Sequence, residues 1–190
     1  MKSVVVGSGG REHALAHVLG RDSDVTVTPG NPGIPNSTTQ SPLNIDADLF
    51  VIGPEAPLVD GLADQLRAQG KTVFGPGVDG AQLEGSKAWM KDLLVEANVP
   101  TAKHGTFTNE DEAIAFLSDM PLPYVIKTDG LAAGKGVIVT ESVNEAKDAI
   151  KNYLSGDAFG DAGKTVVIEE GLIAVSYTHL RAHETHDDRV

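Results

Sequence analysis

The sequence contains no cysteine, which excludes a disulfide framework and thiolate chemistry and is compatible with a cytoplasmic location. It also has no run of about 18 apolar residues, so we expect no membrane-spanning helix. The N-terminal stretch MKSVVVGSGG lacks the apolar region and cleavage site of a signal peptide. We interpret this stretch as a first buried strand that runs directly into a glycine-rich loop.

Basic residues are scarce, with 15 Lys and Arg against 27 Asp and Glu and a formal net charge of -12. Non-specific binding of nucleic acid needs clustered Lys and Arg to neutralise phosphates, so we expect no nucleic-acid partner. A phosphorylated ligand would have to be bound by backbone N–H groups and a few placed lysines. The hydrophobic content of 41% is ordinary for a globular protein, and 190 residues suffice for one large or two small domains.

Strand and helix patterns alternate through the first half of the chain. We expect strands at 2–7, 24–30, 47–55 and 71–77, and helices at 12–20, 58–70 and 86–100. This alternation predicts a parallel sheet covered by helices, whose ligands lie at the carboxyl ends of the strands. The connection 31–46 has enough residues for a parallel crossover, which needs a dozen or more, but we expect its covering helix to be absent.

The second half has a different pattern, which predicts a smaller α+β unit. We expect helices at 109–120 and 146–154, and strands at 123–128, 136–140 and 164–170. The segment SVNE, residues 142–145, has the form of a capping box before the second of these helices.

The segment DGLAAGKGV, residues 129–137, has the glycine content of a phosphate-binding loop. A P-loop reads G-x-x-x-x-G-K-[ST] between a strand and a helix, but here Asp129 replaces the first glycine and Gly136 the hydroxyl residue. The β-branched residues that follow predict a strand. The unit is therefore strand, loop, strand, and it is either a flap that closes over phosphates with Lys135 or an ordinary glycine-rich hairpin turn.

Charged residues near this segment favour the flap. Lys127 lies in an apolar strand, where a lysine is unusual unless it reaches a partner or solvent. Lys87 opens a predicted helix, and Glu169 and Glu170 end a buried strand.

The N-terminal loop GSGGREHA, residues 7–14, follows a strand and opens a helix, which is the context of a dinucleotide-binding fingerprint. Glu12 stands where the third glycine of G-x-G-x-x-G would be, so NAD binding is weakly supported. Gly9 and Gly10 still permit a close backbone approach to an anion at the helix N-terminus, and Arg11 adds positive charge. Glu12 could serve equally as an N-terminal cap or as a ligand-binding residue.

Several segments in this order resemble the phosphoribosylamine–glycine ligases, ATP-grasp enzymes of purine biosynthesis. They are GSGGREHA, PGNPG (29–33), IGPEAPLVDG (52–61), FGP (74–76), LEGSKAWMK (83–91), VPTA (99–102), IKTDGLAAGKGV (126–137) and VVIEEGL (166–172). The resemblance implies an α/β fold in which a parallel-sheet, pre-ATP-grasp domain at 1–100 precedes a partial α+β ATP-grasp subdomain at 101–172.

The same resemblance implies a cytoplasmic enzyme that uses ATP and Mg²⁺ or Mn²⁺ to join glycine to 5-phosphoribosylamine, giving glycinamide ribonucleotide, ADP and phosphate. The residues implied in ATP binding are Lys87, Lys127, Gly130, Gly134, Lys135, Gly136, Glu169, Glu170 and Leu172. The residues implied on the phosphoribosylamine side are Gly9, Gly10, Arg11, Asn31, Gly33, Pro54 and Glu55.

The resemblance ends at Leu172. We expect residues 173–190 to be a non-native tail, and the family's metal ligands to lie in sequence that this chain does not contain. The histidines of the tail do not reproduce H-E-x-x-H, so we expect no metal site there. Two other functions stay open, another ATP-grasp ligase or carboxylase and a non-catalytic nucleotide-binding module. We expect the isolated chain to have no ligase turnover.

Overall fold

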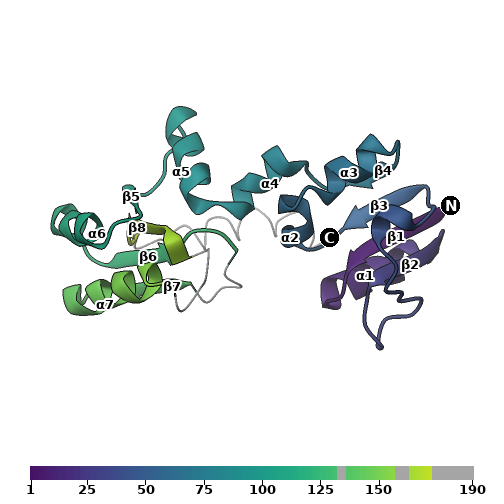
Figure 1. The fold of residues 1–190 in the computed structure, drawn as a ribbon, viewed down its shortest axis with the longest axis horizontal. Helices are drawn as coiled ribbons and strands as arrows, with labels where there is room; N and C mark the ends of the chain where they lie inside the picture. The colour runs from purple at the N-terminus through teal and green to yellow at the C-terminus, as the bar shows by residue number, and fades with distance from the viewer. Residues whose placement is uncertain (132–135, 157–162, 173–190) are drawn as a thin grey trace, which may run out of the picture. The chain divides into compact units, whose positions relative to one another are not determined.

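The computed structural model describes residues 1–131, 136–156 and 163–172. Contacts between residues divide the chain into two compact units, Met1–Met90 and Lys91–Val190 (Figure 1). Helix α5 (Lys87–Glu96) runs across this division. The domain ranges 1–100 and 101–172 stay a prediction.

The first unit is built on a parallel sheet with strand order β2-β1-β3-β4. Its strands are β1 (Lys2–Gly7), β2 (Asp24–Pro29), β3 (Leu49–Ile52) and β4 (Thr72–Phe74). Alternate residues of β1 face opposite sides, so that Val4 and Val6 pack with Leu66, whereas Val5 packs with Leu19. A central strand that is buried on both faces explains the continuous valine run.

Helices cover both faces of this sheet. Helix α1 (Gly10–Leu19) packs against one face, and α2 (Glu55–Val59) and α3 (Leu62–Ala68) contribute to the core on the other. The single helix expected at 58–70 is wrong, because Gly61 adopts φ +82° and separates α2 from α3.

Two further features of this unit bear on the sequence predictions. Helix α4 (Val78–Gly85) was not predicted, since its sequence VDGAQLEG contains two glycines. The connection between β2 and β3 holds one 3-10 turn, η1 (Pro42–Asn44), and no α-helix, as expected.

The second unit is built on an antiparallel sheet with strand order β5-β8-β6-β7. Its strands are β5 (His104–Phe107), β6 (Tyr124–Thr128), β7 (Val137–Thr140) and β8 (Val166–Glu170). Helix α6 (Glu110–Phe116), the 3-10 turn η2 (Leu117–Asp119) and helix α7 (Val143–Leu154) share a core with β6 and β8. The predicted fold class, a parallel α/β part followed by a smaller α+β part, is confirmed.

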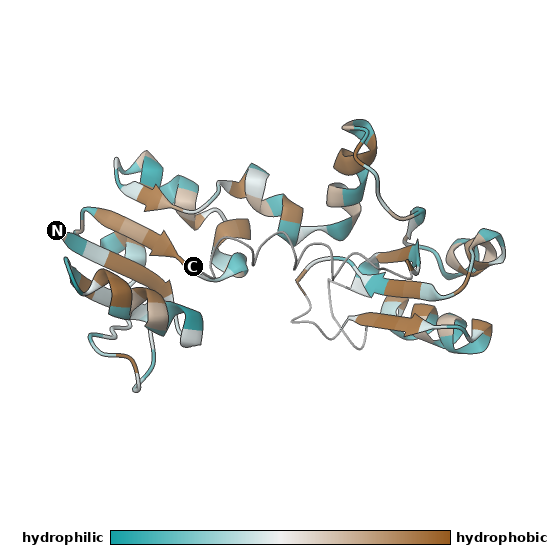
Figure 2. Cartoon of the chain, turned by 180° about the vertical axis from the view of Figure 1, so that it is seen from behind, coloured by the Kyte–Doolittle hydropathy of each residue, from teal (hydrophilic) through white to brown (hydrophobic). Residues whose placement is uncertain are grey.

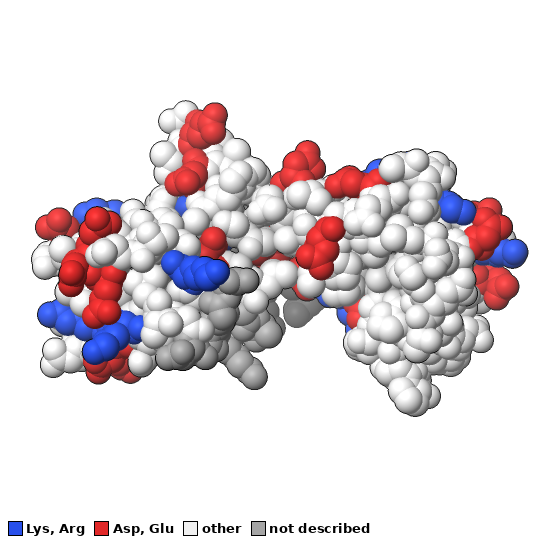
Figure 3. Space-filling view, in the orientation of Figure 1, with Lys and Arg blue, Asp and Glu red and all other residues white. Residues whose placement is uncertain are grey.

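The polarity of the elements agrees with this arrangement. In Figure 2 the strands of both sheets are predominantly hydrophobic, whereas the helices mix polar and apolar residues. On the face shown in Figure 3, basic side chains of the described residues lie among acidic ones. Within the described part of the chain, no helix combines the length and the apolar character needed to cross a bilayer.

Candidate nucleotide-binding and substrate-binding sites

The glycine-rich segment joins two antiparallel strands. The N–H of Thr128 donates to the carbonyl of Gly136 (2.8 Å), and the N–H of Asp129 donates to the carbonyl of Thr165 (2.9 Å). Gly130 adopts φ +79°, a conformation that favours glycine, where the chain leaves β6. The predicted order of strand, loop and strand is therefore confirmed, while Gly134 and Lys135 lie outside the described residues.

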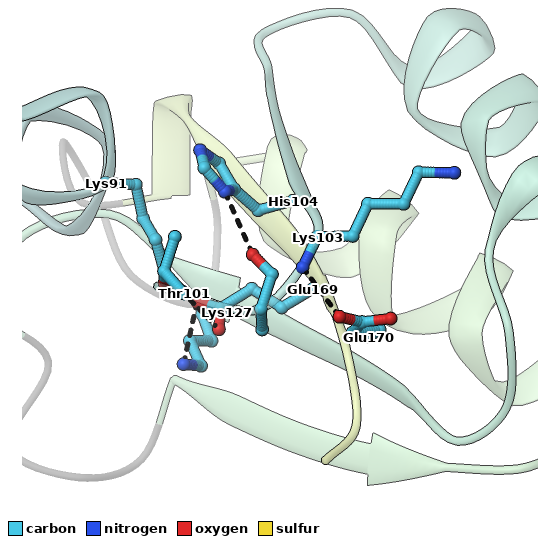
Figure 4. A network of polar contacts seen from close by, with 8 residues as sticks. Lys91, Thr101, Lys103, His104, Lys127, Glu169 and Glu170 are labelled. Carbon is cyan, nitrogen blue, oxygen red and sulfur yellow. Dashed lines mark hydrogen bonds and ion pairs between the residues drawn. The ribbon is translucent and has the colours of Figure 1, made fainter. Parts of the chain in front are cut away.

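Three charged side chains and one hydroxyl form a polar cluster beside this hairpin. We call it the lysine–glutamate cluster, and its residues are Lys91, Thr101, Lys127 and Glu169. Lys127 Nζ lies 2.8 Å from Glu169 Oε1, and Lys91 Nζ lies 2.9 Å from Glu169 Oε2. Lys91 Nζ also donates to the hydroxyl of Thr101 (2.7 Å). Figure 4 shows Lys91, Lys127 and Glu169 converging from α5, β6 and β8, with Thr101 in the segment between α5 and β5.

The strand register explains how Lys127 and Glu169 meet. Ile126 and Ile168 belong to the core beneath α6 and α7, so the residues that follow each of them point to the opposite face of the sheet. Lys127 pairs directly with Val167, which puts Glu169 at the diagonal position on that face. A long side chain reaches a diagonal partner readily.

The ionisation of Glu169 depends on its lysines. Burial by itself raises the pKa of this carboxyl, because its side chain is only 7% exposed. Hydrogen bonds and charge from Lys127 and Lys91 outweigh burial and hold the pKa of Glu169 below its ordinary value. The carboxylate is therefore charged at neutral pH.

The two adjacent carboxylates of β8 lie in different surroundings. Glu170 accepts a hydrogen bond from the backbone N–H of Lys103 (2.9 Å) and is turned away from Glu169 (Figure 4). Leu172, two residues further on, is 66% exposed. Of the predicted ATP-binding residues, Glu169 and Lys127 are thus brought into contact, whereas the side chain of Glu170 takes no part in this cluster.

Sequence reasoning did not single out Lys91. Its side chain is 6% exposed, and a lysine is almost never buried to this degree unless it is paired. The available signal was its position one helical turn after Lys87, beside the apolar residues Trp89 and Met90. Lys87 begins α5 within the first unit, and its predicted contact with ATP phosphates stays a prediction.

Three loops meet at the carboxyl edge of the parallel sheet in the first unit. Asn31 Nδ2 donates to the carbonyl of Ser8 (2.7 Å), and Asn31 Oδ1 accepts from the N–H of Gly33 (2.7 Å). Arg11 Nη1 lies 3.1 Å from Oε1 of Glu55, and Pro54 caps α2. The segment after β1, with the start of α1, therefore contacts both the loop after β2 and the start of α2 after β3, and the predicted substrate-binding residues lie in these segments.

Glu12 is buried at this edge, where it contacts both Gly9 and Arg11. Its side chain is 5% exposed, accepts from the N–H of Gly9 (2.7 Å) and lies 2.9 Å from Arg11 Nε. Burial raises the pKa of Glu12, but the bonds to Arg11 and Gly9 outweigh it and lower the pKa overall. Glu12 thus has the capping role, one of the two that the sequence left open, and it also holds Arg11.

Comparisons with known proteins identify the family of the chain. Residues 1–84 match the family model described as the phosphoribosylglycinamide synthetase N domain, and residues 85–186 match the ATP-grasp (A) domain of the same family. The chain belongs to the phosphoribosylglycinamide synthetase family.

Individual relatives give the extent of the match. A phosphoribosylamine–glycine ligase of Escherichia coli O6:H1 is 47% identical over 190 residues, covering 90% of this chain and 44% of the relative. The crystal structure of a Thermotoga maritima phosphoribosylamine–glycine ligase is 29% identical with a TM-score of 0.75, covering 90% of this chain and 44% of that one. This member of the phosphoribosylglycinamide synthetase family therefore spans less than half the length of the relatives it matches.

A more distant structure shares the fold alone. The biotin carboxylase domain of a Hydrogenobacter thermophilus 2-oxoglutarate carboxylase, in complex with MgADP, ADP and bicarbonate, has a TM-score of 0.66 at 16% identity, covering 90% of this chain and 44% of that one. The prediction of a non-native tail at 173–190 lies outside the described residues and stays a prediction.

The described residues of the hairpin offer a partly exposed ammonium. The ammonium of Lys127 is held at the hairpin by an acidic partner, and its side chain is 24% exposed, so it is accessible to a phosphate. In contrast, no group of three His, Asp or Glu residues within 1–131, 136–156 and 163–172 is placed to hold a metal.

Proposed function

We propose that this chain forms the N-terminal part of a cytoplasmic ligase that joins glycine to 5-phosphoribosylamine at the expense of ATP. The observation that carries the proposal is the lysine–glutamate cluster beside a glycine-rich hairpin, in a chain of the phosphoribosylglycinamide synthetase family. The partners are small molecules, and the net charge of -12 argues against nucleic acid.

The nucleotide would lie on the second unit. Lys127 and Lys135 would neutralise the phosphates, and Gly130, Gly134 and Gly136 would let the hairpin approach them closely, while the phosphate contact that the family resemblance implies for Lys87 stays a prediction. Glu169, Glu170 and Leu172 would line the adenine, the latter two through their backbone. Phosphoryl transfer depends mostly on positioning and charge neutralisation, which suits a site made of lysines and glycines.

The proposed ligation proceeds in two steps, phosphoryl transfer to glycine and amide formation. The carboxylate of glycine takes the terminal phosphoryl group of ATP, which yields an acyl phosphate and ADP. The amine of 5-phosphoribosylamine then attacks the acyl carbon, forms the amide bond and releases phosphate together with a proton. Mg²⁺ or Mn²⁺ would assist phosphoryl transfer, and the structure of the Hydrogenobacter carboxylase domain with MgADP supports a divalent ion.

The phosphoribosylamine would bind at the carboxyl edge of the parallel sheet. Gly10 opens α1, so its backbone N–H group can receive the phosphate at a helix N-terminus, whereas the N–H of Gly9, the N-cap residue, is bound to Glu12. Arg11, held by Glu12 and Glu55, would add a fixed positive charge. Asn31, Gly33 and Pro54 would shape the loops around the sugar.

A chimaera tests the proposal. Residues 1–172 would replace the matching segment of the Escherichia coli relative, and amide formation would be measured from glycine, ATP and 5-phosphoribosylamine generated in situ. We expect ADP release that depends on both substrates and is lost in the Lys127→Met chimaera. A matched Lys147→Met chimaera, altered on an exposed position of α7, should retain activity.

The unmodified chain is the second arm of this experiment. We expect it to bind ATP without turning over glycine. A folded chimaera that releases ADP with another carboxylic acid but not with glycine would favour a different ATP-grasp ligase. A folded chimaera that binds ATP and never releases ADP would favour a non-catalytic module.

A further inference from the structure

The two lysines that flank Glu169 are not equivalent. The Lys127 side chain is 24% exposed, whereas the Lys91 side chain is 6% exposed and has a second partner in Thr101. A partly exposed ammonium can turn toward an arriving phosphate, whereas a buried ammonium with two partners is held in place. The two positive charges therefore suit two different tasks.

Binding of a nucleotide changes the balance of charge at Glu169. Under the proposed function Lys127 moves to the phosphates, and Glu169 loses the partner at Oε1. A buried carboxylate without any counter-charge would take up a proton or follow Lys127. The contact of Lys91 with Oε2 prevents both outcomes, because it keeps a positive charge 2.9 Å from the carboxylate.

We propose that Lys91 is a positioning residue, which keeps Glu169 charged and oriented toward the nucleotide base while Lys127 engages the phosphates. This inference rests on the proposed function. It assigns Lys91 a role in recognition of the base and none in direct contact with phosphate. Thr101 contributes by fixing the second direction of the Lys91 ammonium.

Among the described residues, a further titratable side chain, His104, lies next to Glu169 on the neighbouring strand. His104 pairs directly with Glu169 across β5 and β8, and its Nδ1 lies 3.2 Å from the carbonyl of Ala102. Lys91 of α5 and Lys127 of β6 supply the positive charges, and Glu170 is turned away toward Lys103. A His104→Gln background removes this neighbour, so that pH-dependent measurements in that background report on Glu169.

Binding assays on the full 190-residue chain test the inference, with ATP and inorganic tripolyphosphate as probes. Lys91→Met should weaken ATP binding about tenfold, as expected when a carboxylate loses one charge-assisted hydrogen bond, and should weaken tripolyphosphate binding by a smaller factor, because tripolyphosphate has no base to be recognised. Lys127→Met should weaken both. Lys91→Arg should restore most of the ATP affinity, and Lys147→Met is the matched surface control.

Two readouts distinguish positioning from general stability. The ATP affinity of Lys91→Met, measured in the His104→Gln background, should fall further as pH decreases from 8 to 5, whereas the Lys91 parent in that background should change little. A ¹³C titration of the Glu169 carboxyl in the ligand-free chain should show a higher pKa in Lys91→Met. If Lys91→Met does not fold, Thr101→Val and Lys91→Arg provide the same comparison with smaller shifts.

The outcomes separate the inference from the proposed function. Wild-type chain that does not bind ATP would overturn the proposed function and the inference that rests on it. ATP binding that Lys91→Met leaves unchanged, or equal loss of ATP and tripolyphosphate binding, would overturn the inference alone.

Discussion

Replacement of Gly53 by Ala tests how closely Glu12 is packed beneath the parallel sheet. A Cβ at residue 53 would lie 2.2 Å from Oε1 and 2.7 Å from Cγ of Glu12, well inside contact distance. Gly7 also packs closely against Glu12, because a Cβ at residue 7 would lie 2.4 Å from the same Cγ. As a result, Glu12 has no room to shift toward residue 7. Glu12 therefore has to turn out of its buried position when residue 53 becomes Ala.

The cost follows from the contacts that Glu12 loses. Its bonds to the N–H of Gly9 and to Arg11 are bonds to a charged group, each worth about 1.5–3 kcal/mol. Arg11 is more than half exposed, so its bond counts less. We expect Gly53→Ala to lower the free energy of unfolding of the first unit by about 2–4 kcal/mol.

The assay has to isolate the first unit, because a chain with two units need not unfold in one transition. Urea unfolding followed by hydrogen–deuterium exchange in peptides from β1 and α1 does so. In a Glu12→Ala background, Gly53→Ala should cost less than about 0.5 kcal/mol, since the obstructing side chain is gone. Gly10→Ala is the control, with no atom within 4 Å of its new Cβ. An equal cost of Gly53→Ala in the wild-type and Glu12→Ala backgrounds would show that the substitution does not act by displacing Glu12.

Two further predictions concern the second unit and the effect of acid. Gly171→Ala would put a Cβ 2.4 Å from Cγ and 2.8 Å from the carbonyl oxygen of Pro123. Urea unfolding of the second unit should therefore show a loss of about 1–3 kcal/mol from this clash. Gly156→Ala is the comparison variant, because its new Cβ meets no atom within 4 Å and any cost there comes from the backbone at φ +79°. Glu12 and Glu169 have lowered pKa values in the folded chain, so their stabilisation is present above the unfolded pKa of about 4.3 and is lost as pH falls through the folded values. Glu169→Gln should reduce this acid dependence of the urea midpoint, and an unchanged dependence would contradict the assigned ion pairs.

Much of the fold follows from local patterns in the sequence. The valine run of β1 and the alternation of strands with helices predict the parallel sheet, and the β-branched residues after Gly136 predict a hairpin where a P-loop would need a helix. The break at Gly61 was missed because a glycine inside a helical pattern has no fixed effect until packing sets its φ angle. Strand β5 was missed because HGTF is short, and it is stabilised by pairing with β8, whose paired residues lie 59 to 65 positions further along the chain.

The candidate site was predictable in part. Lys127 and Glu169 stood out because charged residues in apolar strands need partners, and they are indeed paired with each other. Lys91 could not be recognised in the same way, because a lysine on an amphipathic helix is ordinary until tertiary packing buries it against another strand. The opposite directions of Glu169 and Glu170 follow from strand alternation and were available from the sequence.

Hydrogen–deuterium exchange of the full chain with and without MgATP locates the nucleotide, and so tests whether ATP binds at the hairpin and at β8. We expect MgATP to slow exchange in peptides that cover residues 124–140 and 166–172, and we expect this protection to be lost in Lys127→Met. Protection by MgATP confined to other peptides, or left intact by Lys127→Met, would contradict this expectation.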